Sequence, residues 1–228
     1  MVAFGQILKK PILDIPKWGL INIHASLLPK YRGAAPIQWT ILNDDSQTGL
    51  TVIRMDEGMD SGPILFQESF PILKDETAGQ LYDRLAIGAG DLIIKSLNRM
   101  VENPVQEYPQ EQTEATYAPK IDRHISLIDW KQEASKVSAL IRGLDPRPGA
   151  YSTLEGKAIK LFSSRVVDED RLDTVPGKVV KTVTGGLNVR TGRGVIEVGE
   201  LQYSGKKRLK ASDFLRGFAL RDGTIMGQ

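Results

Sequence analysis

Three side chains that could perform acyl transfer lie close together in the first part of the sequence. Asn22 and His24 are separated by one residue in a β-type run, and Asp60 follows in a glycine-containing loop. Residues two apart in a strand point to the same side, so an amide and an imidazole would stand next to each other. An amide can hold a developing oxyanion, an imidazole can manage protons, and a carboxylate can orient the ring. The trio therefore predicts acyl transfer to an amine.

Each of these residues also has an ordinary structural interpretation. A histidine near a strand end can simply be hydrogen-bonded, an asparagine can close a turn, and an aspartate in a loop can cap or turn it. The spacing around Asp60 does not supply the alternating oxygen ligands and terminal glutamate of an EF-hand, which sets a calcium loop aside. The prediction of chemistry depends on the three residues occurring together.

The elements that must position this trio form an α/β pattern. Short β-type runs at 2–4, 20–24 and 50–55 are separated by turn residues, and apolar residues recur at helical spacing between 77 and 101. We expect a sheet covered by one long amphipathic helix. Open α/β sheets place their sites at the carboxyl ends of strands, which is where the amide and the imidazole stand.

The second half of the chain has a different pattern. Residues 102–123 are polar and interrupted by prolines, which predicts an extended linker. Asp129 is then expected to cap a helix whose apolar stripe runs from Trp130 to Leu144. The strand-like runs that follow lie at 158–162, 178–183, 187–190 and 195–201. Short strands with glycine turns favour a small β-barrel or sandwich, and a barrel of the OB type is a nucleic-acid platform.

Charge separates the two halves more clearly than the net charge of +2 suggests. Residues 1–119 carry 10 Lys and Arg against 15 Asp and Glu, whereas residues 120–228 carry 20 against 13. This split suggests that the second half meets a polyanion, with chance asymmetry as the alternative. The residues expected to contact phosphate are Lys120, Lys206, Lys207, Arg208 and Lys210. A solvated basic turn is the alternative for this cluster.

Composition excludes several classes of protein. The chain has no cysteine and two histidines, which excludes a disulfide scaffold and makes us expect no metal site. Its apolar runs are far shorter than the roughly 20 residues that span a bilayer, and the start lacks the pattern of a signal peptide. We expect a soluble protein without a membrane partner, located in the cytoplasm or, in a eukaryote, in an organellar matrix.

A longer motif surrounds the trio. The run from Asn22 to Pro36 reads Asn-x-His-x-Ser-Leu-Leu-Pro-x-Tyr-Arg-Gly-Ala-x-Pro, and Thr48-Gly49 and Asp60-x-Gly62 follow it. This combination resembles the signature of the folate-dependent formyltransferases, in which 10-formyltetrahydrofolate donates a formyl group to an amine. The resemblance implies that the trio is catalytic and that the formyl donor is the cosubstrate. It also implies that the folate lies along Ser26, Leu27, Leu28 and Pro29. Arg32 is either a buried structural residue or a ligand contact.

The second half resembles the branch of this family that formylates methionyl-tRNA. The matching stretches are Tyr117-Ala118-x-Lys120, Ile128-Asp129-Trp130, Asp145-Pro146, Gly149-Ala150, and Pro176-Gly177 through Lys206-Lys207-Arg208. The resemblance implies a methionyl initiator tRNA as partner, a role in translation initiation, and a monomer. It divides the chain into a Rossmann-like catalytic portion at 1–105, a linker at 106–123 and an OB-like tRNA-binding domain at 124–228.

The resemblance begins inside the catalytic domain. A complete family member would start with further βαβ units, so we expect this chain to lack the amino-terminal third of that domain, which leaves the activity of the chain as written open. Two alternatives therefore stand beside the enzyme: a catalytically deficient tRNA-binding remnant, and a formyltransferase for another small amine.

Overall fold

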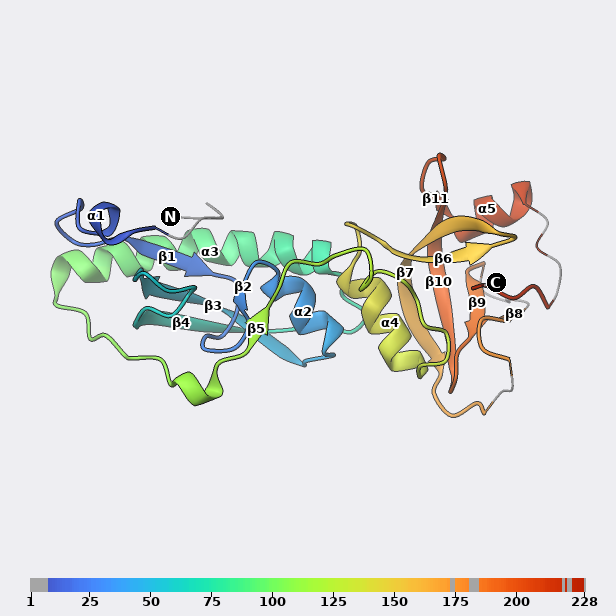
Figure 1. Cartoon of the computed structure of the whole chain (residues 1–228), viewed down its shortest axis with the longest axis horizontal. Helices are drawn as coiled ribbons and strands as arrows, with labels where there is room; N and C mark the ends of the chain where they lie inside the picture. The colour runs from blue at the N-terminus through green and yellow to red at the C-terminus, as the bar shows by residue number, and fades with distance from the viewer. Residues whose placement is uncertain (1–7, 173–174, 181–184, 219, 221–222, 228) are drawn as a thin grey trace. The chain divides into compact units, whose positions relative to one another are not determined.

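The computed structural model describes residues 8–172, 175–180, 185–218, 220 and 223–227, and it divides into two compact units. The first unit consists of 1–40, 45–73 and 80–120, and the rest of the chain forms the second. Each unit has its own main sheet (Figure 1). Within the described part of the chain, no helix is long and apolar enough to cross a membrane.

The first unit contains a three-stranded sheet in the order β1-β3-β4, with neighbouring strands antiparallel. The strands are β1 at Ile21–His24, β3 at Gln47–Arg54 and β4 at Ile64–Pro71. β1 and β3 confirm the runs expected at 20–24 and 50–55, and β4 was not predicted. The run expected at 2–4 lies outside the described residues.

Helix α3, at Ala78–Glu102, lies along this sheet (Figure 1) and confirms the predicted helix. Leu81, Leu85 and Leu92 form its buried stripe. Gly88 allows close packing, because a Cβ atom there would lie 2.6 Å from the ring of Phe70 in β4. The shorter elements of this part of the chain are α1 at Lys10–Leu13, β2 at Arg32–Gly33, α2 at Pro36–Leu42, η1 at Gln112–Glu114 and β5 at Tyr117–Ala118.

The polar stretch after α3 packs on the first unit. Tyr108 and Ile64 exchange backbone hydrogen bonds of 2.8 and 2.9 Å, and β5 pairs with β2 in parallel. The backbone groups of an extended segment need partners, and strand edges supply them. The first unit therefore extends to Lys120 and the second begins at Ile121, so most of the linker predicted at 106–123 belongs to the first unit.

The second unit contains a larger antiparallel sheet in the order β6-β7-β10-β9-β8, with β11 paired to β10. Its elements are α4 at Ala134–Gly143, β6 at Ala150–Leu154, β7 at Lys157–Asp168, β8 at Val179–Val180, β9 at Leu187–Arg190, β10 at Val195–Tyr203, β11 at Leu209–Lys210 and α5 at Ala211–Gly217. Helix α4 buries Val137 and Ile141 in a core that includes Leu161 of β7 and Ile196 of β10.

Most strands of this sheet were predicted. β7, β9 and β10 confirm the runs at 158–162, 187–190 and 195–201. The run at 178–183 is described only to residue 180, where it forms β8, and its remainder lies outside the described residues. Closure of the sheet into an OB-type barrel stays a prediction.

The helix of the second unit begins later than the apolar pattern predicts. Asp129 does not cap it, since its carboxylate accepts hydrogen bonds of 3.0 Å from Gln132 Nε2 and from the Lys131 backbone N–H. These bonds, the one from Gln132 first, lower the pKa of the Asp129 carboxyl. Trp130 lies in the turn that they form and is 5% exposed, so its burial does not require helical backbone. Helix α4 starts at Ala134.

Candidate active site

His24 and Asp60 lie together in the first unit, as the motif predicts. His24 ends β1 and is 6% exposed, and its Nδ1 lies 3.6 Å from Asp60 Oδ2. The same carboxylate oxygen accepts a hydrogen bond of 2.9 Å from the backbone N–H of Gly33. The imidazole and the carboxylate, 36 positions apart in sequence, therefore form a pair whose carboxylate is oriented by a third group.

The second ring nitrogen of His24 fixes its tautomer. Nε2 lies 2.8 Å from the carbonyl oxygen of Tyr31, which can only accept, so Nε2 carries a hydrogen. In a neutral ring, Nδ1 then presents its lone pair toward Asp60. A proton entering between Nδ1 and the carboxylate would be held by both groups. This arrangement can take up a proton from a reacting amine.

Asn22 lies on the same side of β1 as His24, since the two residues are two apart in a regular strand. Among the described residues, no hydrogen-bond partner is found for its carboxamide. Asn22 as a whole residue is partly buried. With respect to the described residues, Asn22 can therefore donate a hydrogen bond to a substrate oxygen next to the His24–Asp60 pair.

The loop that carries Asp60 has a constrained backbone. Asp60 has a φ of +50°, a conformation that residues with a side chain adopt rarely and at some cost. Gly62 is required by close approach, because a Cβ atom there would lie 1.8 Å from the carbonyl oxygen of Arg54. The Asp-x-Gly spacing of the motif thus places a carboxylate on a tight turn against β3.

The buried side-chain amide of Gln110 holds the Asp60 loop by hydrogen bonds. Gln110 is 7% exposed, and its Nε2 donates to the carbonyl oxygens of Asp60 and Gly62 at 2.8 and 2.7 Å. Its Oε1 accepts from Nε and a terminal nitrogen of Arg32 at 3.0 and 2.7 Å. One side chain therefore connects the Asp60 loop with the segment that follows His24.

Arg32 is a buried structural residue rather than a solvent-facing one. It is 2% exposed, and its remaining terminal nitrogen donates to Gln112 Oε1 at 2.8 Å. The partners found for its guanidinium within the described part of the chain are thus amide oxygens of Gln110 and Gln112. A buried cation requires such hydrogen bonds, which makes the two glutamines part of the site's framework.

Some side chains of the predicted folate segment make contacts within the protein. Ser26 is fully buried and its hydroxyl donates to the Lys30 carbonyl at 2.6 Å, so this side chain shapes the loop. Leu28 is buried, while Leu27 and Pro29 are partly exposed. Leu27 packs against Gly49, where a Cβ atom would lie 2.3 Å from Leu27 Cδ2, which explains the glycine of the Thr48-Gly49 motif.

A cavity of about 210 Å³ lies beside this segment. It is lined by Leu27, Lys30, Tyr31, Thr40, Asp45, Ser46, Gln47 and Thr48. The cavity shares Leu27 with the predicted folate segment, and none of the predicted catalytic residues lines it. No cluster of residues suited to hold a metal ion is found among the described residues.

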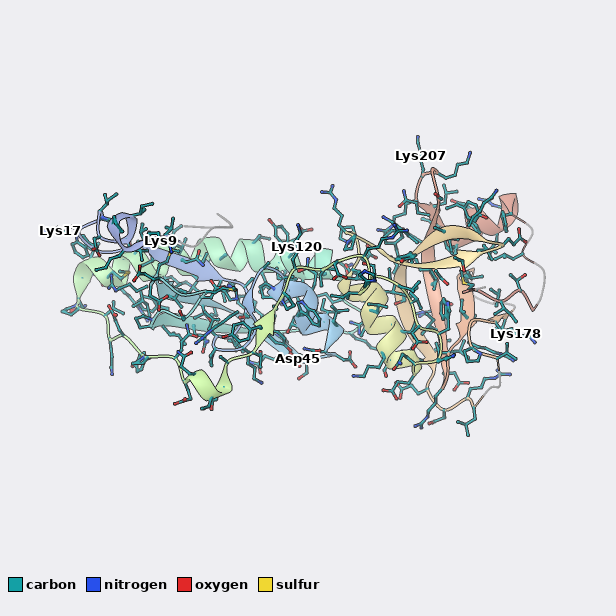
Figure 2. All side chains as sticks on the ribbon, in the orientation of Figure 1. Lys9, Lys17, Asp45, Lys120, Lys178 and Lys207 are labelled. Atoms are coloured by element: carbon teal, nitrogen blue, oxygen red, sulfur yellow. The ribbon has the colours of Figure 1, made fainter. Side chains whose placement is uncertain are left out.

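In the second unit, two of the predicted phosphate contacts lie on an exposed turn. Lys206 and Lys207 follow β10 and are exposed, and Figure 2 shows Lys207 extending from the turn between β10 and β11. Lys210 at the end of β11 is exposed as well. In the first unit, Lys120 is exposed at the last residue before the boundary.

Arg208 differs from its basic neighbours. It forms ion pairs with Asp145, at 2.7 Å, and with Glu200, and its guanidinium lies 4.0 Å from the ring centroid of Phe162. Burial opposes its charge, but the bonds and charges of the two carboxylates outweigh burial and raise the pKa of the guanidinium. These carboxylates satisfy much of the hydrogen-bonding capacity of Arg208, so its contact with phosphate stays a prediction.

The sequence motif missed three features of the site: the carbonyl of Tyr31, the backbone N–H of Gly33 and the side chain of Gln110. Backbone groups leave no trace in residue type. Gln110 lies in a proline-interrupted polar stretch that has no periodic pattern, so only its position in the Asp60 network identifies it.

Comparison with known proteins matches both parts of the chain to formyl transferase family models. The family model described as formyl transferase matches residues 1–97, and the model described as formyl transferase, C-terminal domain, matches residues 120–219. A methionyl-tRNA formyltransferase of Syntrophus aciditrophicus is 43% identical over 227 residues, which is 100% of this chain and 72% of that protein.

Solved structures share the fold at lower identity. The crystal structure of HypX from Aquifex aeolicus, in complex with tetrahydrofolic acid, is 22% identical with a TM-score of 0.68, and the match covers 86% of this chain and 34% of that chain. WlaRD, a sugar 3N-formyl transferase solved in the presence of dTDP and 5-N-formyl-THF, is 23% identical with a TM-score of 0.69. That match covers 90% of this chain and 72% of WlaRD.

Proposed function

Because this chain belongs to the methionyl-tRNA formyltransferase family, we propose that it transfers a formyl group from 10-formyltetrahydrofolate to the α-amino group of methionyl-tRNA. The observation that carries this proposal is the pairing of His24 with Asp60 on the side of β1 that also carries Asn22, all within the stretch that matches the formyl transferase model. Formylation of the initiator tRNA would provide the charged tRNA with which protein synthesis begins.

Asn22 is assigned to the formyl oxygen. When an amine attacks the formyl carbon, a carbon–nitrogen bond forms and negative charge develops on that oxygen. An amide that has no partner among the residues that the structure describes is suited to this role, because it can donate to the oxygen without breaking a bond to any of them. Removal of such a donor typically slows acyl transfer by about 100- to 1000-fold.

His24 and Asp60 are assigned to the proton of the attacking amine. The amine must lose a proton as it becomes an amide, and the former bond from the formyl carbon to the donor nitrogen must break. His24 Nδ1 and Asp60 Oδ2 lie 3.6 Å apart, and both are acceptors when the imidazole is neutral. The pair can therefore take up the amine's proton, directly or through a water molecule, and return it to the leaving nitrogen.

The residues present suit a folate cosubstrate. The formyl donor supplies an electrophilic carbon when it is bound, and the chain supplies an amide and a proton acceptor on one side of β1. Leu27 and Pro29 offer partly exposed apolar surface from the predicted folate segment. Ser26 is assigned to loop structure, since its hydroxyl is used by the Lys30 carbonyl.

The second unit is proposed to bind the tRNA. Its exposed lysines, Lys206, Lys207 and Lys210, belong to the half of the chain with 20 basic and 13 acidic residues, and Lys120 adds a further cation immediately before it. Contacts of this kind position RNA through its phosphates without reading its sequence. A monomeric state and a cytoplasmic location remain predictions.

The test is formyl transfer by the purified full chain. The chain is incubated with 10-formyltetrahydrofolate and either methionyl-initiator tRNA or a dTDP-linked amino sugar, and formylated product is measured over time. Transfer to the methionyl-tRNA alone supports the proposal. Faster transfer to the amino sugar would overturn it in favour of a small-amine enzyme.

A second measurement distinguishes an inactive RNA-binding protein. Binding of methionyl-tRNA is measured by filter retention at several salt concentrations in the same preparation, after circular dichroism has confirmed that it is folded. Salt-dependent binding without detectable transfer would overturn the enzymatic proposal and favour the catalytically deficient remnant.

A further inference from the structure

A groove of about 500 Å³ opens on the second unit. Four segments line it: 121–126, 148–151, the start of β7 and residues 202–205. Gly149, Ala158 and Gly205 contribute to its walls and keep them low, because they carry little or no side chain. A volume of this size is within the range of sites that take a small organic ligand.

The strand register places three functional side chains in a row across this groove. Tyr151 of β6 is opposite Lys160 of β7, and Lys160 is opposite Gln202 of β10. Directly opposed residues of antiparallel strands point to the same face, so a phenol, an ammonium and a carboxamide lie side by side. All three residues line the groove.

Hydrogen bonds hold the backbone of Tyr151 in place. Besides its place in β6, its N–H donates to the Ser126 carbonyl at 2.8 Å and its carbonyl accepts from Ile128 N–H at 2.9 Å. The guanidinium of Arg123, an exposed side chain, lies 5.8 Å from its ring centroid. The ring face thus already receives a flat cationic group from a long side chain. A flat base could stack on the same face and leave the guanidinium to pair with a phosphate.

The charges around the groove favour an anion. Arg123 and Lys160 line it, and the one carboxylate among its described lining residues, Asp122, already accepts from the backbone N–H groups of residues 124 and 125 at 2.8 and 3.0 Å. Lys206 and Lys207 directly follow the lining residue Gly205. An occupant therefore combines a flat apolar surface with negative charge, which describes a nucleotide.

We propose that this groove is a binding site for an unpaired nucleotide of RNA. The base stacks on Tyr151, Gln202 meets the edge of the base, and Lys160 and Arg123 pair with the adjacent phosphate. The site rests on the proposed binding of RNA by the second unit and adds to it a feature that phosphate contacts lack: preference for a base that is free to leave its helix.

The test compares two RNA probes with the full chain. One is a single-stranded RNA hexamer, the other is a fully paired RNA duplex of the same length, and both carry a fluorescent label for anisotropy titration at one fixed salt concentration. Tyr151→Ala is expected to weaken binding of the hexamer by about 5- to 100-fold, the range for removal of one base–aromatic stack, and to leave duplex binding unchanged. Tyr151→Phe should bind the hexamer as the unmodified chain does.

Tyr82 offers a matched control, because it is 61% exposed and lies in α3 of the first unit. Tyr82→Ala should leave both probes unaffected. Equally weakened binding of both probes in Tyr151→Ala, with no rescue by phenylalanine, would overturn the site and assign Tyr151 a structural role. Binding of a hexaglutamate peptide that depends on Tyr151, without binding of the hexamer, would overturn it in favour of an acidic peptide.

Formyl transfer separates this inference from the proposed function. If the chain formylates methionyl-tRNA while Tyr151→Ala binds the hexamer normally, the proposed nucleotide site is wrong and the enzymatic proposal is supported. If the chain binds the hexamer through Tyr151 yet transfers no formyl group, the nucleotide site is supported and the enzymatic proposal is wrong.

Discussion

The candidate active site and the groove of the second unit are assembled in opposite ways. The site gathers His24, Asp60 and Gln110 from segments far apart in sequence and holds them by a 3.6 Å contact between His24 and Asp60 and by hydrogen bonds from the buried Gln110. The groove takes Tyr151 and Lys160 from adjacent strands and leaves its cations exposed. The first kind of site should fail when one buried group is removed, and the second should weaken in steps and respond to salt.

The largest effect is expected at the imidazole, and the chain's two histidines form a matched pair. His24→Ala should slow single-turnover formyl transfer by about 100-fold or more, because proton transfer by a positioned side chain contributes about that much. The exposed His124 has no place in the site, and His124→Ala should react at the normal rate. An unchanged rate in His24→Ala would remove this residue from the mechanism.

The next effect tests the buried framework. Gln110→Glu keeps an acceptor for Arg32 but removes the two hydrogen bonds that Nε2 donates to Asp60 and Gly62. A displaced Asp60 should lower kcat by about 10- to 100-fold with little change in the KM for tRNA, since small misplacements of reacting groups cost this much. The measurement is steady-state kinetics together with a melting curve.

Gln112 supplies the control for this framework, because it also binds Arg32 and, among the described residues, no hydrogen bond joins it to the Asp60 loop. Gln112→Glu should retain near-normal kcat. Gln110→Met should be slow and also less stable, because each buried group left without a partner costs about 1–3 kcal/mol. Equal kcat values for the two glutamate variants would show that Gln110 does not position the loop.

In the second unit, Arg208 should affect stability more than RNA affinity. Arg208→Ala removes the ion-pair partner of Asp145, whose side chain is only 4% exposed, and should lower the free energy of unfolding by about 1–3 kcal/mol. Urea unfolding measures this decrease, and Lys210→Ala provides an exposed control. Weaker tRNA binding with unchanged stability would instead support its predicted contact with phosphate.

The smallest and most salt-sensitive effect is expected for the exposed turn. Replacing Lys206 and Lys207 together by alanine should reduce the dependence of log affinity on log salt by about 2, roughly 1 for each phosphate that the variant no longer neutralises. Formyl transfer at saturating tRNA should be unchanged. The control replaces Lys131 and Lys136, two exposed lysines of the same unit. An identical change of slope in the control would assign the effect to net charge alone.

Local pattern predicted much of this molecule. The helix α3 repeats its apolar residues over 25 positions, and β1 carries the amide and the imidazole at a spacing that places them on one side. The motif predicted the place of Asp60 in the site, since a loop aspartate has no periodicity of its own. The structure brings it to 3.6 Å from His24.

The features that the sequence did not predict depend on contacts between distant segments. Gln110 meets Arg32 across 78 positions and Asp60 across 50, and no local pattern reports such a contact. β4 alternates more exposed with less exposed residues, so a period-two signal is present there, but it is short and interrupted by polar side chains. The ion pair of Arg208 with Asp145 was also missed, because a run of basic residues does not show which of them has a buried carboxylate next to it.

The packing of residues 108–118 on the first unit determines where this protein can be divided. A fragment ending at residue 105 would lack Gln110 and β5, and would leave the Arg32 guanidinium in the interior without the two amide oxygens that now solvate it. A fragment ending at Lys120 keeps both glutamines and the Tyr108 pairing with β4. Expression of the first unit by itself should therefore use the later end point, 15 residues beyond the boundary at residue 105 that the family resemblance implies.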